Sequence, residues 1–499
     1  MSSYRSDQRS ATTITAFGEP VAQQITPLIQ QDGIYNITLR EFETFTAVSG
    51  NVAATNAVIT AWTGTSAGGY GVIRTRKHLR YRPGQGALTR FTAGFSTPDA
   101  NTTQRAGFFS QEQALMIGYN GTQFGVLRQN GGKAEIYEIE ITSSASGSGN
   151  LTITLNGTAY TVAVTSGDTA TTISSKIAAS STFAAVWLVE QINAHVRFAC
   201  KTNGAKTGTY SFANDATGVT ATAFTHLQTG VADTNNWTYQ SDFSIDTLDG
   251  SGNHRNPSKM LVDPSKLNVY QINYRWLGAG EIRYAIEDQA SGDMTFFHHE
   301  NYTNQYTVPH LDNPSMKIGY IAANITAGTS ANVSVYGASL VGAIEGPVIV
   351  NKFPVGTSGD AKTGLSSGAY NHLLSIKNAL VHNNKYNLRI VRLKRISVGF
   401  DGNATATLYL FLNATLSTTR IWTAANLLDS SANYSTTDGT FTIENETPLA
   451  AFALPSNGYI DLDVDNLNIE IPPNNHVSLA IVSGQSITNA RTAATWVED

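Results

Sequence analysis

The chain is poor in cysteine and has no long apolar runs. Its 499 residues contain one cysteine, Cys200, so no disulfide can form within the chain. Proteins without disulfides are typical of reducing compartments, and we therefore expect synthesis in a cytosol. No stretch approaches the ~18 consecutive apolar residues of a membrane helix. The first residues, MSSYRSDQRS, lack the apolar centre of a secretory signal. These absences argue against a secreted disulfide scaffold and against a membrane span.

Charge is scarce as well. Charged residues make up 14% of the chain, and the formal net charge is -5. Proteins that bind nucleic acid usually carry a basic excess, so we do not expect nucleic acid as a partner. The H-E-x-x-H and Walker sequences of metalloproteases and nucleotidases do not occur. We expect a protein without enzymatic activity and without a cofactor.

Strand and turn signals are abundant. Glycine occurs 43 times, and short β-branched or aromatic runs alternate with Gly, Asn, Asp and Ser. In LNVYQINYRW, the side chains of Tyr270, Ile272 and Tyr274 fall on one face of a strand. Asn120-Gly121 predicts a tight hairpin turn. We expect a mainly all-β protein with two β-sandwich or jelly-roll-like domains.

A Gly/Ser-rich stretch, SSASGSGN at residues 143–150, begins a segment of different composition. Two alternating runs flank Asn156-Gly157, and SGDTATTISSKIAAS predicts a helix with Asp168 as its N-cap. We expect a small ββαβ-like α+β domain inserted in the first sandwich. The predicted boundaries are a docking arm at 1–35, a discontinuous sandwich at 36–142 and 231–341, the insert at 143–230, a linker at 342–364 and a C-terminal sandwich at 365–499.

The first 35 residues carry more large apolar side chains than a solvated tail usually has. They show no sustained helix or strand period. We expect an arm that docks on a partner through Ile14, Phe17, Val21, Ile25 and Leu28.

The run RTRKHLRYRPGQG is the most basic in the chain. At strand period its basic side chains fall on one face, and Pro83-Gly84 ends the strand. So many charges cannot fill an apolar core. We interpret the row as an inter-strand or inter-subunit charge ladder on an assembly face, with nucleic acid as the minor alternative. The residues of this predicted face are Arg74, Arg76, His78, Arg80 and Arg82.

Two groups of residues have the types needed for chemistry. On a strand, His298 and Glu300 share a face while His299 points away, and two ligands are too few for a closed transition-metal site. Asp246 and Asp249 in IDTLDG could form a glycosidase pair only across a cleft, whereas Asp before Gly is ordinary turn chemistry. We expect no metal and no catalytic residue at either place.

Aromatic side chains exposed on a sandwich can bind sugars by stacking. Tyr302 and Tyr306, in NYTNQYT, are our candidates for surface recognition of a host glycan. A loop that packs against the next subunit is an equal alternative.

Four motifs occur in a fixed order along the chain: YRPG at 81–84, GFF at 107–109, DTLDG at 246–250 and WLGAG at 276–280. This order resembles a group of poorly characterised β-rich proteins encoded by tailed phages and large DNA viruses. The resemblance covers most of the chain except the insert, whose GDTATTISSKIAA is similar to helix-bearing modules of phage tail and flagellar-type assembly proteins. The chain has Phe243 and Ser244 where the group tends to have Trp and Asn.

The resemblance implies a non-enzymatic structural protein of a virion, made in the host cytoplasm. It would be a tail, fibre or head-appendage component that acts through subunit packing. Its partners would be copies of itself, with a trimer favoured, and other virion proteins. The alternative is a carbohydrate-binding host-receptor module of the virion, and a lesser alternative is a polysaccharide depolymerase.

Overall fold

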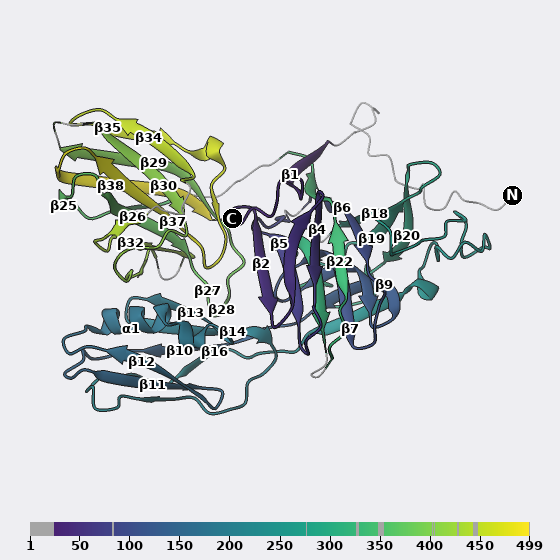
Figure 1. The fold of residues 1–499 in the computed structure, drawn as a ribbon, viewed down its shortest axis with the longest axis horizontal. Helices are drawn as coiled ribbons and strands as arrows, with labels where there is room; N and C mark the ends of the chain where they lie inside the picture. Colours follow the sequence, from purple (N-terminus) through teal and green to yellow (C-terminus); the bar gives the residue numbers. More distant parts are fainter. Residues whose placement is uncertain are drawn as a thin grey trace. The chain divides into compact units, whose positions relative to one another are not determined.

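The computed structural model describes residues 24–499 except 82–83, 276, 326–328, 348–353, 402, 404, 427–428, 443–447 and 499. The chain divides into two compact units, Met1–Arg128 with Asn235–Ile349 and Gln129–Thr234 with Val350–Asp499. Strands dominate both units, which confirms the mainly all-β class (Figure 1). Within the described ranges, no helix is long and apolar enough to cross a membrane.

The first unit is a sandwich of a nine-stranded and a seven-stranded sheet. The nine strands are β1 (Ile25–Asp32), β3 (Asn51–Thr55), β4 (Val58–Trp62), β6 (Ala87–Phe95), β18 (Asn268–Tyr274), β19 (Ile282–Glu287), β20 (Met294–Glu300), β22 (Ser334–Gly337) and β23 (Ser339–Glu345). The seven strands are β2 (Phe42–Ala47), β5 (Tyr70–Thr75), β7 (Thr102–Phe109), β8 (Ala114–Asn120), β9 (Gln123–Asn130), β17 (Thr234–Tyr239) and β21 (Lys317–Asn324). A short 3-10 helix, Gln240–Asp242, follows β17.

The core of this sandwich follows the period of two that the sequence predicts. Tyr270, Ile272 and Tyr274 of β18 are all buried in one cluster between the sheets. β4 pairs with β22 although the two strands come from distant parts of the chain, and Figure 1 shows them side by side. The first sandwich is therefore completed by strands from both sides of the insert.

The insert lies in the second unit and has two small sheets and a helix, as the α+β prediction requires. Helix α1 (Ala170–Ala179) begins after Thr169, whose hydroxyl accepts the Thr172 N–H, so Asp168 is not the predicted N-cap. Asp168 instead pairs with Lys176 in the last turn. The strands are β10 (Ala134–Glu140), β11 (Gly149–Leu155), β12 (Thr158–Val164), β13 (Trp187–Ile192), β14 (His195–Asn203), β15 (Ser211–Ala213) and β16 (Thr225–Gln228), with a 3-10 turn at Ser181–Phe183.

The C-terminal domain is a second sandwich with its own core. One sheet holds β24 (Pro354–Ser358), β25 (Lys362–Leu365), β29 (Val391–Asp401), β35 (Tyr459–Asp463), β36 (Glu470–Ile471) and β38 (Ile487–Glu498). The other holds β26 (Tyr370–Asn378), β30 (Ala406–Leu412), β31 (Thr423–Ala424), β32 (Ala432–Ser435), β33 (Thr440–Phe441), β34 (Ala450–Leu454) and β37 (His476–Ser483). A 3-10 turn covers Asp465–Leu467.

A hairpin of the C-terminal domain, β27 (Val381–His382) and β28 (Lys385–Tyr386), packs on the insert. Leu380 and Val381 form a buried apolar cluster with Ile136 and Ala199 of the insert. The insert is thus anchored to the C-terminal sandwich by apolar packing, which explains why the two belong to one unit.

Several strands differ from the predicted boundaries. β1 lies in the predicted arm and β10 in the predicted first sandwich, β24 lies in the predicted linker, and β23 and β25 run across the two ends of that linker. β10 pairs with β14 and β16, so the insert begins before the Gly/Ser-rich stretch. β24 pairs with β38 and is part of the C-terminal sandwich. Composition located the breaks only approximately, because edge strands can be as rich in Gly and Ser as a linker.

Candidate functional site

An exposed tyrosine stands on the loop that follows β20. The ring of Tyr306 is 61% exposed and stacks on Tyr302, with ring centroids 4.3 Å apart and planes at 22°. Tyr302 is only 7% exposed, so it supports Tyr306 rather than presenting a surface of its own. Of the two predicted recognition residues, the structure places Tyr306 at the surface and Tyr302 beneath it.

The support beneath Tyr306 is built from buried polar groups. Tyr302 meets the edge of His310 at 5.2 Å, and the His310 Nε2 lies 2.8 Å from the Gly280 carbonyl oxygen. The Arg128 guanidinium lies over the Tyr302 ring and donates to Glu300 at 2.6 Å. These contacts come from β9, β20 and the loop after β18, and they hold Tyr302, on which Tyr306 stacks, in place.

Polar and apolar side chains surround the tyrosine. Asn304 and Gln305 are exposed next to it in the chain, as is Val308. Thr303 donates to the Ala279 carbonyl oxygen at 2.8 Å and so joins this loop to the loop after β18. Such a mixture of a rigid aromatic ring with exposed amides suits a ligand that has both apolar C–H faces and hydroxyl groups.

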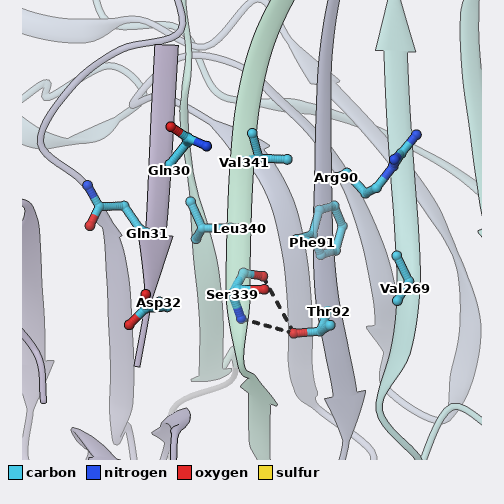
Figure 2. Close-up of a pocket in the computed structure, with 10 residues that line it drawn as sticks. All are labelled: Gln30, Gln31, Asp32, Arg90, Phe91, Thr92, Val269, Ser339, Leu340 and Val341. Atoms are coloured by element: carbon cyan, nitrogen blue, oxygen red, sulfur yellow. Dashed lines mark hydrogen bonds between the residues drawn. The ribbon is translucent and has the colours of Figure 1, made fainter. Parts of the chain in front are cut away.

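A shallow pocket of about 390 Å³ lies on the same sheet, on the outward face of β1, β23, β6 and β18. Figure 2 shows Gln30, Arg90 and Val269 around it, with Thr92 and Ser339 joined by hydrogen bonds. These side chains offer donors and acceptors, and they lie on strands rather than on loops.

A row of polar side chains, which we call the polar track, continues from this pocket across β18 and β19. The Arg90 Nε donates to the Gln271 Oε1 at 2.9 Å, and the Gln271 Nε2 donates to the Asn273 Oδ1 at 2.7 Å. Asn273 lies opposite Arg283 in the register of β18 and β19, which makes the two side chains cross-strand neighbours. The track therefore reaches from the pocket towards β20.

The track ends at the tyrosine loop. Arg283 donates to Glu281 at 2.6 Å, and the Nδ1 of His299 lies 3.2 Å from the same carboxylate. The Nδ2 of Asn301, the first residue after β20, lies 3.5 Å from the His299 Nε2. Polar contacts therefore run from Arg283 through Glu281 and His299 to Asn301, where the loop that carries Tyr306 begins.

The basic row takes a different form from the prediction. β5 ends at Thr75, so the single strand expected from 74 to 82 is wrong. His78 is only 8% exposed, and burial holds its pKa well below its usual range. Arg80 is half-buried, and Arg82 lies outside the described residues. Arg76, the first residue after β5, donates from its Nε to the Leu39 carbonyl oxygen at 2.7 Å.

Glu43 of β2 is the partner that the sequence did not reveal for this row. It lies opposite Arg74 in the strand register and accepts from the Arg74 Nε at 3.0 Å. The Arg76 Nη1 lies 3.8 Å away, and the Lys317 Nζ donates to the same carboxylate at 2.7 Å. Two of the five predicted residues, Arg74 and Arg76, thus meet a carboxylate within the chain, and the role of the row in assembly remains a prediction.

Lys317 makes this cluster sensitive to pH. It is 5% exposed, and burial with the neighbouring Arg74 lowers its pKa to about 7 against the opposing pull of Glu43. Between pH 7 and about 10.5 the unfolded chain binds this proton and the native chain does not, so the free energy of unfolding is expected to rise with pH. Urea unfolding at pH 7, 8 and 9 measures the slope. Lys317→Met should flatten the dependence of the unfolding free energy on pH. Lys266→Met, at an exposed lysine, should not. Equal slopes in the two variants would show that Lys317 does not cause the dependence.

The predicted arm docks within the chain as far as it is described. Ile25 and Leu28 lie in β1, which pairs along its length with β23. Ile25 is 48% exposed, and Leu28 packs at the edge of the sandwich core. These two residues therefore belong to a strand of the first sandwich, and their docking on another subunit stays a prediction. Ile14, Phe17 and Val21 lie outside the described residues.

The histidine pair and its neighbour take separate partners. His298 is buried beside Ser244, whose backbone N–H lies 3.2 Å from the His298 Nδ1. His299 faces Glu281, and Glu300 is held by Arg128. Among the residues that the structure describes, no three His, Cys, Asp or Glu side chains gather as metal ligands.

The two aspartates of IDTLDG have unlike roles. Asp246 is 1% exposed and accepts from the Leu248 backbone N–H at 2.9 Å and from the Asn256 side chain at 2.6 Å. Asp249 is exposed and accepts from the Ser251 backbone N–H at 2.9 Å. The other Asp246 oxygen, Oδ2, accepts the Ser258 backbone N–H at 2.9 Å, so both oxygens of this buried carboxylate hold the local loop together.

The chain contains two G-x-S-x-G sequences, the pattern of a hydrolase nucleophile, at 64–68 and 364–368. A nucleophile elbow needs a strand, a sharp turn and then a helix. Here the turns lead into β5 and β26. The geometry of a hydrolase nucleophile is therefore not formed at Ser66 or Ser366.

No family model matches the chain, and no curated protein matches it. Among solved structures, a legume lectin-like domain from Entamoeba histolytica is similar over 61% of this chain and 90% of its own, at 8% identity and a TM-score of 0.22. A lectin from Bauhinia forficata in complex with GalNAc covers 65% and 98%, at 9% identity and 0.21. The mavirus major capsid protein covers 100% and 92%, at 10% identity and 0.12. Similarity at this level carries no information on what this chain binds.

Proposed function

We propose that the chain is a non-enzymatic glycan-binding protein that uses Tyr306 as its contact ring. The observation that carries this proposal is the exposed Tyr306 ring stacked on buried Tyr302. Since Tyr302 covers one face of the ring, the other is free to stack on the C–H face of a sugar. The ordered support lowers the entropy that binding would otherwise cost.

The polar track supports the same proposal. The loop that carries Tyr306 begins at Asn301, which contacts His299 at the end of the track. Amide and guanidinium groups hydrogen-bond readily to vicinal hydroxyl groups. We infer that the glycan is a chain rather than a single sugar, because donors and acceptors continue along the sheet to Arg90.

Replacing Tyr306 by alanine is expected to abolish glycan retention while the chain stays folded. The loss of one stacked ring should weaken binding by roughly tenfold or more. A glycan array probed with the full chain identifies the ligand, and titration of the retained glycan measures the change. Tyr459→Ala is the matched control, because Tyr459 is 68% exposed on β35 of the other unit.

Two results would contradict the proposal: no glycan retained by the unmodified chain, or equal retention by the Tyr306 and Tyr459 variants. Release of reducing sugars from host polysaccharide would instead overturn the non-enzymatic part and favour a depolymerase. Thermal unfolding of both variants separates a lost contact from a lost fold.

We also propose that the chain belongs to a virion, on the resemblance of its four motifs. Two of these motifs meet in the first sandwich, where the Tyr81 hydroxyl accepts the Leu277 backbone N–H at 3.1 Å. Tyr81 also stacks on Tyr274 at 6.1 Å. These contacts support a shared sandwich architecture. Labelling the chain in purified particles by electron microscopy tests the location, and its absence from particles would exclude it.

A further inference from the structure

The C-terminal sandwich contains a polar cavity of about 580 Å³, far from any motif that the sequence singles out. This volume is within the range of small-ligand sites, about 300–1,000 Å³. Its walls are β25 and the loops at 421–423 and 436–440. The side chains that line it include Asp360, Lys362, Leu365, Ile421, Thr423 and Asp438.

Buried polar side chains hold the loop at 436–440 in place. Lys362 is 5% exposed, and its Nζ donates to the Thr436 carbonyl oxygen and to the Asp438 Oδ1, the latter at 2.6 Å. His372 is 1% exposed, and its Nδ1 lies 2.6 Å from the Thr437 carbonyl oxygen. Ile421 donates its N–H to the Thr437 hydroxyl at 3.0 Å. The cavity wall is therefore formed in the absence of a ligand.

The charges around the cavity leave a small negative excess. Asp360 and Asp438 carry two negative charges, and Lys362 returns one positive charge. Burial lowers the pKa of His372 to about 4, so the imidazole is neutral at pH 7. The Asp438 side chain is 91% exposed while one of its oxygens binds Lys362, and Asp360 is also exposed. Acceptors for hydroxyl groups are thus presented to solvent, and an acidic ligand would be repelled.

We propose that this cavity is a second binding site, which takes a neutral sugar of one or two rings. The two carboxylates and the Thr423 hydroxyl bind the sugar hydroxyls, and Leu365 and Ile421 provide apolar contact for its C–H groups. The site lies in the C-terminal sandwich and shares no residue with the Tyr306 loop, so the two proposals stand or fall separately.

Isothermal titration of the full chain at pH 7 with methyl glycosides of glucose, galactose, mannose and N-acetylneuraminic acid tests the site. At least one neutral glycoside is expected to bind, and Asp360→Asn and Thr423→Val should each weaken it by about tenfold. The N-acetylneuraminic acid glycoside should not compete for this binding. Asp463→Asn, a matched change at an exposed carboxylate on β35, should leave it unchanged, and the heat that remains in Tyr306→Ala is the part assigned to the cavity.

The proposal is overturned if no neutral glycoside binds, or if binding persists unchanged in both cavity variants. It is also overturned if Tyr306→Ala alone removes the signal, since the sugar would then occupy the loop. Urea unfolding checks that the cavity variants are folded. A third variant, Asp438→Asn, should weaken binding of the same neutral glycoside that Asp360→Asn weakens.

Discussion

Replacing Glu190 by alanine is expected to lower the free energy of unfolding of the second unit by about 3–5 kcal/mol, the cost of breaking a buried ion pair. Glu190 of β13 is fully buried, and its Oε1 accepts the Leu380 backbone N–H at 2.8 Å. The same oxygen lies 3.4 Å from the Nζ of Lys377, which is 7% exposed. Without the carboxylate, an ammonium group and a backbone N–H are left buried at the junction of insert and C-terminal sandwich.

Chemical denaturation measures this loss, and hydrogen exchange at Leu380 locates it. The amide of Leu380 should exchange faster in the variant, because its acceptor is gone. Asp461→Ala is the control: Asp461 of β35 pairs with Arg395 of β29 at the surface, where solvent screens the ion pair and its loss should change the free energy of unfolding little. Equal effects of the two substitutions would show that Glu190 does not hold the insert in place.

Acidification is expected to unfold the protein between pH 6.5 and 4. Burial lowers the pKa of His298, His310 and His372 to about 4 each. In this window the unfolded chain binds a proton at each of these three histidines that the native chain does not, so their contribution to stability is fully present above pH 6.5 and is lost as the pH falls towards 4. A shift of that size corresponds to about 3 kcal/mol for each histidine, against a typical total stability of about 5–15 kcal/mol.

Urea midpoints at pH 7, 5.5 and 4.5 measure this dependence. His310→Gln should reduce the slope by about one proton, because glutamine does not titrate. His254, which is exposed, provides the matched control, and His254→Gln should follow the unmodified chain. A slope that His310→Gln leaves intact would mean that other groups dominate acid unfolding.

The strands were predictable because their signals are local. Alternation in LNVYQINYRW gives the buried face of β18, and the insert's helix follows from apolar residues at helical spacing, with Ile173 and Ile177 in its core. Where a local signal is ambiguous, the prediction fails. The predicted linker contains β24 because a short edge strand carries few large apolar residues. Alternating basic residues predicted a strand that continues beyond Thr75, but β5 ends there.

The candidate sites depended on contacts between distant residues. Tyr302 and Tyr306 look alike in the sequence. In the structure His310 and Arg128 cover Tyr302, which therefore supports the exposed ring of Tyr306. The cavity at Asp360 carries no motif at all. Its walls come from segments of β25 and the 421–423 and 436–440 loops that only the sheet order brings together.

The sequence by itself determined the mainly all-β class, the α+β insert and the residue types available for recognition, since strand period and turn chemistry act over a few residues. Only the tertiary structure decided which charges are neutralised and which aromatic ring is exposed. Glu43 meets Arg74 through the register of β2 and β5, and Glu190 meets Lys377 through the docking of one domain on another. Such pairings depend on packing across the whole fold, which no short stretch of residues encodes.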